Sequence, residues 1–422
     1  MLLIFRNRPS LTVARPKLIL FLLLAMPMAG ISLADEISIS VSGNKRTRTS
    51  YIENIVNDYL SRNHIDSTTN VDAERLKDLI VDKELFSEVD VNIVGNRIDI
   101  EVKDRWTLIP IPIATAQSGQ DTKFGLFVME TNLFGYGKTG ILGGLYSQSQ
   151  SSFFAMYQDP EVAFTDWMFS AQVSISQNIE YLYDGEEKVF GDNRKINGAS
   201  LSLGYEFSEQ IKSAINIGIA DVDYNSLNEY PEPEDFKTIL GGFNMNWDDA
   251  TFRYYYREGW SGFFEMNYQL IRNDDIPKSH DVRIQLNSEK RILLEQVLQV
   301  QGSGGYQGGG DERDLMRVGS KRGFRGIPNS GAWVDRYLTL AFDYQIPLWR
   351  GRIGTWTVAP FCDVGYLRQP TIDKSEELTY TALGLGTYLF LRKLAIPGVG
   401  VLVGHNDTYQ DSFFEVTIGF AI

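Results

Sequence analysis

The last ten residues of the chain alternate strictly between two kinds of side chain. One parity is apolar throughout and consists of Phe414, Val416, Ile418, Phe420 and Ile422. The other parity is mixed and consists of Phe413, Glu415, Thr417, Gly419 and Ala421. Successive side chains of a β-strand point to opposite faces of the sheet. The pattern therefore predicts a strand with one face toward lipid and the other toward a polar lumen.

Similar alternation recurs through residues 106–422. In one segment the apolar residues Leu338, Leu340, Phe342, Tyr344 and Ile346 oppose Thr339, Ala341, Asp343 and Gln345. The chain has 12% aromatic residues and 38 glycines, and short alternating stretches of this kind are typical of a membrane barrel. At roughly 20 residues per strand and connection, residues 106–422 predict a transmembrane antiparallel β-barrel of about 16 strands. A soluble β-sandwich, with the apolar face as its core, remains the alternative.

Residues 35–105 follow a different pattern. The apolar spacing predicts a strand at 37–41, helices at 50–60 and 72–83, and a hairpin at 89–102 that turns at Gly95 and Asn96. Ser50 and Glu53 have the spacing of a capping box at the start of the first helix. The predicted fold class is thus mainly β, with a small β-α-α-β-β domain followed by the barrel.

The first 34 residues form a segment of their own. They contain no acid and four bases, followed by an apolar run at 18–28; the bases are Arg6, Arg8, Arg15 and Lys17. This is the pattern of a secretory signal peptide, and we expect cleavage after Ala34. The apolar run is shorter than the roughly 18 to 20 residues of a membrane-spanning helix. The chain has one cysteine, Cys362, so no internal disulfide can form. Because no cysteine lies near the cleavage site, the sequence does not indicate a lipoprotein.

Charge and motif content exclude several function classes. Without the four leader bases, 36 Lys and Arg face 54 Asp and Glu, a net charge of −18, which disfavours a broad nucleic-acid surface. His64, His280 and His405 have no metal-ligand spacing, so we expect no metal site. Residues 302–310 are rich in glycine but lack the following Lys-Ser/Thr of a phosphate loop, and we expect no cofactor. Without a Gly-x-Ser-x-Gly motif we expect no enzyme, although a barrel hydrolase could place its residues on separate strands.

Three motifs in the barrel resemble a known family. Residues 319–326, Gly-Ser-Lys-Arg-Gly-Phe-Arg-Gly, look like the Val-Arg-Gly-Phe/Tyr loop of BamA/TamA-type outer-membrane assembly and secretion barrels, with Lys321 in place of the usual apolar residue. Residues 361–365 are similar to the Phe-x-Asp-x-Gly strand of this superfamily, and residues 132–137 to its Asn-Leu-Phe-Gly-x-Gly stretch. Residues 35–105, with Leu85, Phe86 and Val89 at a junction, resemble a single POTRA domain. An unrelated small α/β fold is the alternative for that domain.

The resemblance implies a location and partners. The barrel would lie in the outer membrane of a Gram-negative bacterium, with the POTRA-like domain in the periplasm. The partners would be unfolded or extended client proteins, the lipid bilayer, and periplasmic or lipoprotein accessory proteins. The resemblance also implies that this domain receives extended segments at an exposed sheet edge, by strand addition.

The resemblance also implies a loop locked inside the barrel. It pairs Arg322 with Asp363, and Asp343 lies nearby in the alternation as a second acceptor. A guanidinium can bind carboxylates in a bidentate way that lysine cannot reproduce. The other members of this expected lock are Gly323, Phe324 and Gly365. The alternative is that Arg322 and Arg325 are ordinary exposed loop charges.

Two prolines suggest a weak closure of the barrel. Pro110 and Pro112 lie two apart in the expected first strand, so two backbone donors would be missing from one edge. We hypothesise a lateral seam there with the last strand, which carries Phe420 and Ile422. The alternative is that both prolines lie in the connection below the membrane.

The sequence thus favours protein translocation or insertion, in a specialised or accessory assembly factor. One alternative is a two-partner-type secretion transporter for one dedicated partner. The other is a passive pore or a lipid-handling barrel.

Overall fold

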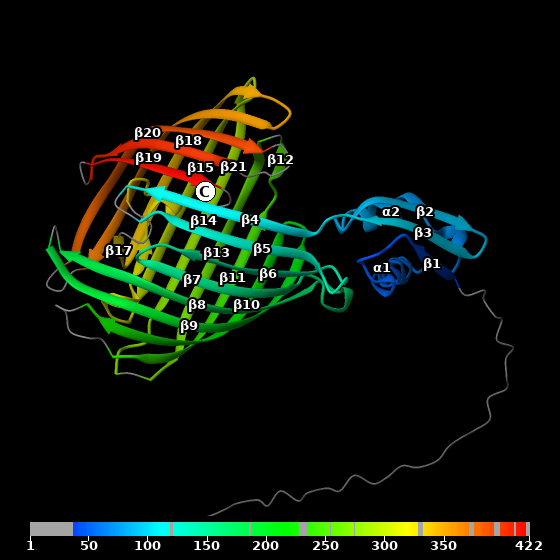
Figure 1. The fold of residues 1–422 in the computed structure, drawn as a ribbon, viewed down its shortest axis with the longest axis horizontal. Coiled ribbons are helices and arrows are strands. Elements are labelled where there is room, and N and C mark those ends of the chain that lie inside the picture. The colour runs from blue at the N-terminus through cyan, green and yellow to red at the C-terminus, as the bar shows by residue number, and fades with distance from the viewer. Residues whose placement is uncertain are drawn as a thin grey trace, which may run out of the picture.

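The computed structural model describes residues 37–422 except 119–120, 185–186, 228–233, 254, 274, 328–331, 371–374, 392–396, 409–410 and 419–422. The expected leader therefore lies outside the described residues. A small α/β region precedes a large barrel (Figure 1). Within the described ranges, no helix is long and apolar enough to cross a membrane. Nor do three or more His, Cys, Asp or Glu gather there in a group that could hold a metal ion.

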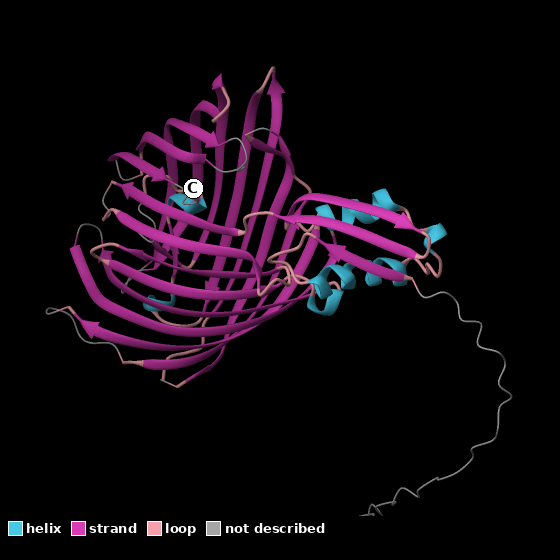
Figure 2. Cartoon of the chain, turned by 45° about the vertical axis from the view of Figure 1, so that its right-hand side comes forward, coloured by secondary structure: helices cyan, strands magenta, loops and turns pink. Residues whose placement is uncertain are grey.

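The α/β region contains a three-stranded sheet and two helices (Figure 2). Its elements are β1 (Ser38–Ser42), α1 (Thr49–Arg62), α2 (Ala73–Val81), β2 (Phe86–Val94) and β3 (Arg97–Asp104). β3 is central, parallel to β1 and antiparallel to β2. The apolar stripes of both helices meet one face of the sheet, and the core includes the fully buried Ile52, Val56, Leu76, Ile80 and Ile98. This confirms the β-α-α-β-β order.

The start of α1 differs from the prediction. The N-cap residue is Arg48, and no side chain caps the helix, so the capping box of Ser50 and Glu53 is wrong. The chain before the helix is instead held by the carboxylate of Asp104 at the end of β3. That carboxylate accepts from the amides of Lys45 and Arg46 at 2.5 and 2.7 Å.

The barrel wall has sixteen antiparallel strands, as predicted. They are β4 (Leu108–Gln117), β5 (Lys123–Leu133), β6 (Lys138–Tyr146), β7 (Gln150–Asp159), β8 (Trp167–Asp184), β9 (Glu187–Ser208), β10 (Ile211–Ser226), β11 (Phe236–Asp248), β13 (Tyr256–Arg272), β14 (His280–Leu293), β15 (Gln296–Gly308), β18 (Arg336–Arg350), β19 (Gly354–Pro370), β20 (Ser375–Leu391), β21 (Pro397–Asn406) and β22 (Asp411–Ile418). A short strand, β12 (Thr251–Arg253), pairs with β13. The sheet closes because β22 pairs with β4.

The two faces of the wall follow the predicted alternation. On β18, Leu338 is 61% exposed, whereas the neighbouring Thr339 is 1% exposed. On β22, Phe414 points outward and Phe413 is buried inside. A closed sheet that carries its apolar residues on the outside is not a sandwich, in which those residues would form the core. The soluble-sandwich alternative is therefore excluded, and the wall has the apolar outer face that a bilayer requires.

The seam between β22 and β4 closes the wall. Its described part comprises four residue pairs, from Glu415 with Gln117 to Ile418 with Ala114, and it stops where the described residues of β22 end. Beyond Gln117, the Ser118 amide donates to the Phe414 carbonyl at 3.0 Å. We use the word seam for this junction of β4 and β22.

Both prolines lie within β4, so the alternative that places them in a connection below the wall is wrong. Residues two apart direct their amides to the same neighbour, and Ser118 donates to β22. Pro110 and Pro112 share the parity of Ser118, so the two missing donors face β22. Phe420 and Ile422, expected on the other side of the seam, lie outside the described residues.

Candidate functional site

The connection between β15 and β18 folds into the barrel interior. It contains 3-10 turns at Glu312–Asp314 and Ser320–Arg322 and two short strands, β16 (Met316–Val318) and β17 (Ala332–Val334), which pair with each other. Its side chains Met316, Val318, Phe324, Ile327, Trp333 and Val334 are buried, several of them against inward-facing residues of the wall. The connection therefore packs inside the barrel, against the inner face of its wall. Residues 319–327 are called the lumen loop below.

The centre of the lumen loop is a clamp of one arginine and two carboxylates. Arg325, 8% exposed, donates from Nε and Nη2 to Asp363 on β19 at 2.9 and 2.6 Å. From Nη1 and Nη2 it donates to Asp343 on β18 at 2.8 and 2.9 Å. The guanidinium carbon also lies 4.1 Å from the centre of the Phe361 ring. One guanidinium thus binds two carboxylates, each in a bidentate way, and joins two wall strands to the loop.

This geometry corrects the predicted pairing of Arg322 with Asp363. Arg322 ends the 3-10 turn and donates to the Tyr337 hydroxyl at 2.9 Å. Gly323 then takes φ +80°, a left-handed conformation that reverses the chain and turns the following residues toward β18 and β19. Arg325, and not Arg322, consequently reaches Asp363 and Asp343. The alternative of exposed loop charges is wrong for Arg325.

The other predicted members of the lock surround Phe324. This ring is fully buried and lies edge-on to the rings of Tyr337 and Tyr380, at 5.9 and 5.1 Å. Gly365 leaves room for it, because a Cβ there would lie 3.1 Å from Phe324 Cε1 and 2.9 Å from the Leu338 carbonyl. The structure therefore brings Gly323, Phe324, Asp343, Asp363 and Gly365 together around the loop.

Glycines of β15 provide the space that the lumen loop occupies. A Cβ on Gly305 would lie 2.4 Å from the Tyr337 ring and 3.0 Å from Met316 Sδ. On the same inward face, the Ser303 hydroxyl donates to the Arg322 carbonyl at 3.1 Å. The glycine-rich stretch therefore belongs to the site, a role that the sequence analysis missed. Its signal was small residues on the inward parity of one strand.

The α/β region docks on the barrel at two turns, and the first joins β5 to β6. This turn is the Asn-Leu-Phe-Gly-x-Gly stretch of residues 132–137. Asn132 Nδ2 donates to Thr47 Oγ1 at 2.8 Å. Arg48 donates from its amide to the Gly135 carbonyl and from Nε to the Phe134 carbonyl, both at 3.0 Å. A Cβ on Gly135 would lie 2.5 Å from a backbone oxygen of the α/β region. Residues 132–137 therefore form a surface of the barrel on which the α/β region docks.

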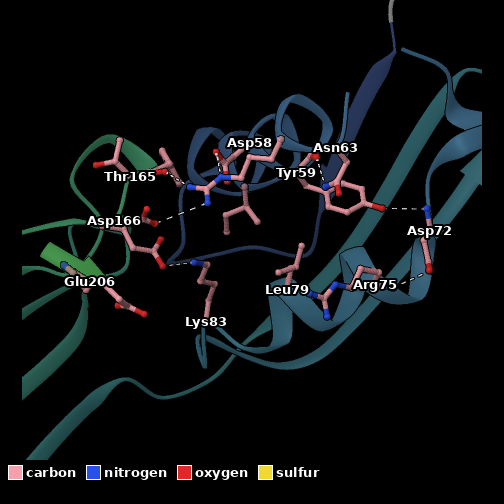
Figure 3. A pocket seen from close by; sticks show the side chains of 15 residues that line it. Asp58, Tyr59, Asn63, Asp72, Arg75, Leu79, Lys83, Thr165, Asp166 and Glu206 are labelled. Atoms are coloured by element: carbon pink, nitrogen blue, oxygen red, sulfur yellow. Dashed lines mark hydrogen bonds and ion pairs between the residues drawn. The ribbon is translucent and has the colours of Figure 1, made fainter. Parts of the chain in front are cut away.

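The second turn, residues 160–166, joins β7 to β8 (Figure 3). Arg62 on α1 donates to the Phe164 carbonyl at 2.9 Å, and Lys83 pairs with Glu161 at 2.5 Å. The Phe164 ring lies 5.7 Å from that of Tyr51 and packs against the core of the α/β region. A cleft of about 590 Å³ opens between this turn and the two helices. Its labelled side chains in Figure 3 are mostly charged.

Both docking turns contain strained backbone. Phe134, Ala163 and Phe164 have φ of +58°, +51° and +61°, and this left-handed region costs a residue with a Cβ roughly 1–2 kcal/mol. Such conformations persist where the surroundings determine them. Here the carbonyls of Phe134 and Phe164 are held by Arg48 and Arg62. The docked α/β region therefore stabilises the shape of the turns that carry it.

Replacing Arg325 by lysine should release the lumen loop. An ammonium cannot serve two carboxylates in fork geometry, and breaking a buried ion pair costs about 3–5 kcal/mol, less in a water-filled lumen. We expect faster proteolysis within residues 319–327 of the folded barrel. Arg322→Lys is the matched control, because the Arg322 guanidinium donates to the Tyr337 hydroxyl and not to the two carboxylates of the clamp. Equal effects of the two variants would contradict the clamp.

Acid should loosen the α/β region through Asp104. Burial alone would raise the pKa of this carboxyl, but hydrogen bonds from the Thr47 hydroxyl and from the amides of Arg46, Lys45 and Thr47 outweigh it and lower the pKa. Stabilisation from a carboxyl with a lowered pKa is complete above its ordinary value near 4 and is lost as the pH falls through the folded-state value.

We therefore expect the melting temperature of the helical circular-dichroism signal to fall between about pH 5 and pH 3. Asp104→Asn should melt lower at neutral pH and show a flatter profile across that range. A variant with the wild-type profile would show that Asp104 does not carry the pH dependence.

Comparison with known proteins identifies the barrel fold. Neither a family model nor a curated protein sequence matches the chain. Among solved structures, BamA from Haemophilus ducreyi lacking POTRA domains 1–3 is similar, with TM-score 0.68 and 12% identity over 91% of this chain and 84% of that chain. CdiB from Acinetobacter baumannii has TM-score 0.59 and 13% identity over 91% and 73%. CdiB from Escherichia coli has TM-score 0.54 and 12% identity over 91% and 90%. The chain therefore shares the fold of BamA and CdiB, a sixteen-stranded barrel that follows a small α/β region.

Proposed function

We propose that this chain is a non-enzymatic outer-membrane transporter that inserts or exports client polypeptides taken from the periplasm. The observation that carries the proposal is the seam. Pro110 and Pro112 lie within β4 and remove two backbone donors from the edge that pairs with β22. Such a junction can open at lower cost than its neighbours, because fewer backbone hydrogen bonds are lost.

The α/β region has the properties of a periplasmic POTRA-type domain that captures clients. Among the described residues, β1 and β2 each pair only with β3, so each keeps one open edge. An extended polypeptide can add to such an edge through main-chain hydrogen bonds, without a fixed sequence. β3 ends at Asp104 and β4 begins at Leu108, so a captured segment would be held close to the seam strand.

The anchored loop inside the barrel argues against a wide passive pore. Arg325 anchors the lumen loop to two strands, and Phe324 is packed between aromatic rings. The loop therefore occupies part of the lumen. Steady large conductance of the wild-type protein in planar bilayers would support the passive-pore reading instead.

Insertion and secretion differ in where the client goes. We compare outer-membrane and secreted proteomes of the wild type, a deletion strain and an Arg325→Ala strain. Loss of a few proteins from the membrane in both mutants supports insertion, and loss of one protein from the medium supports a dedicated secretion partner. Unchanged proteomes, with the variant barrel present in the membrane, contradict client transport and favour a pore or lipid handling.

A disulfide across the seam should stop client transfer. Thr115 and Thr417 face each other, and because Ser118 and Phe414 form a hydrogen-bonded pair, this pair is of the closer, non-hydrogen-bonded kind, with Cα atoms about 4.5 Å apart. In a Cys362→Ser background, Thr115→Cys with Thr417→Cys should abolish transfer when oxidised and restore it when reduced.

The matched control joins β22 to its other neighbour. Val401 and Val416 also form a directly opposed pair, between β21 and β22. Val401→Cys with Val416→Cys adds the same bond without crossing the seam, so client transfer should continue in the oxidised state. Normal transfer through an oxidised seam would remove the seam from the mechanism.

A further inference from the structure

The lumen loop contacts β4, the first strand of the seam, through Gln117. This side chain is buried, and its Nε2 donates to Ser320 Oγ at 2.7 Å and to the Ile327 carbonyl at 3.3 Å. The Ser320 amide also donates to the Ile327 carbonyl, at 3.2 Å. Gln117 therefore binds the point at which the two ends of the loop meet.

The same loop contacts β22, the other strand of the seam, through Phe413. Gly326 takes φ +90°, and a Cβ on it would lie 2.4 Å from the Phe413 ring. Phe413 is buried, with its ring 6.3 Å from that of Phe361 on β19. Loop backbone and seam side chain are thus in direct contact, with no room for a further carbon.

The far side of the loop is anchored on a well-paired part of the wall. Arg325 binds β18 and β19, which are joined by twelve residue pairs. In the seam, Pro110 and Pro112 remove two backbone donors from β4. The loop therefore connects a well-paired part of the barrel, from the inside, to both strands of the seam.

We propose that Gln117 and Phe413 are positioning residues through which the lumen loop holds the seam closed. Release of the loop and opening of the seam are then one equilibrium, set by the Arg325 clamp at one end and by Gln117 and Phe413 at the other. This inference deepens the proposed function and rests on it, since only a transporter of that kind needs a gate.

Amide hydrogen exchange of the purified full-length barrel in lipid nanodiscs tests the coupling without any client. The readout is the exchange rate of peptides from β4 and β22, relative to peptides from β19. Gln117→Ala removes two hydrogen bonds, and we expect about a fivefold to tenfold faster exchange at the seam. Phe413→Leu, on β22, should accelerate seam exchange in the same way. This variant replaces Gln117→Ala as the test if Gln117→Ala fails to assemble.

The decisive variant is Arg325→Ala. In the described part of the barrel, the Arg325 guanidinium forms its hydrogen bonds and ion pairs with β18 and β19 and not with the seam strands, but its loss should still accelerate seam exchange. In the double variant Gln117→Ala with Arg325→Ala, the two accelerations should not multiply, because one released loop accounts for both. Gln345→Ala is the control. Gln345 is a buried lumen glutamine that binds Gln299 on the wall, and its loss should leave seam exchange unchanged.

Two results would overturn the inference. The first is that the seam peptides of Gln117→Ala and Phe413→Leu exchange no faster than those of Gln345→Ala. The other is multiplication of the two effects in the double variant, which would mean that clamp and seam act independently. Failure of the proteome and disulfide experiments would overturn the transport function and leave this coupling intact, so the two proposals can fail separately.

Discussion

A sheet in hydrocarbon has to pair every backbone N–H and C=O, because no water is available there to replace a missing partner. Closure into a barrel satisfies this requirement at every strand except where a donor is absent. Pro110 and Pro112 remove two donors from the edge of β4 that faces β22. The stability of the wall is therefore uneven, and these two residues lower it along the edge of β4 that faces β22.

The lumen loop is held by one guanidinium between two carboxylates. Asp343 and Asp363 lie against the same guanidinium, so Arg325 offsets their mutual repulsion. Partial withdrawal of the arginine would leave two poorly hydrated acids beside each other, a state less favourable than either the bound or the fully hydrated arrangement. The loop should accordingly be either engaged or released, which suits a part that controls a seam.

Periodicity predicts those parts of the fold in which the environment changes with every residue. The wall alternation on β18 and β22 and the helices of the α/β region followed from such patterns, whereas the strand number followed from the length of residues 106–422. The identity of the clamping arginine did not, because Arg322 and Arg325 flank the same Gly-Phe pair and a loop has no periodicity to separate them. The left-handed Gly323 decides between them, and its effect is visible only in three dimensions.

Contacts between distant segments could not be predicted from the sequence. The stretch at 132–137 was recognisable as a motif, but its contact with Thr47 and Arg48 depends on how the α/β region docks. The partners of Asp104 likewise lie more than fifty residues away, because its carboxylate accepts from Thr47 and from the amides of Lys45 and Arg46. A pattern within one segment does not reveal such contacts, because their partners meet only when the chain folds.

The docking geometry also gives the seam two unequal sides. Among the described residues, the hydrogen bonds and ion pairs of the α/β region with the barrel go to the β5–β6 and β7–β8 turns and to Glu130 on β5. The short link after Asp104 ties the same region to β4. The α/β region is thus fastened to β4 and the strands that follow it, whereas the lumen loop is anchored on β18 and β19, on the β22 side. Opening the seam would therefore separate a half that carries the α/β region from a half that carries the loop clamp, and Gln117 is where the loop reaches across to the first of these halves.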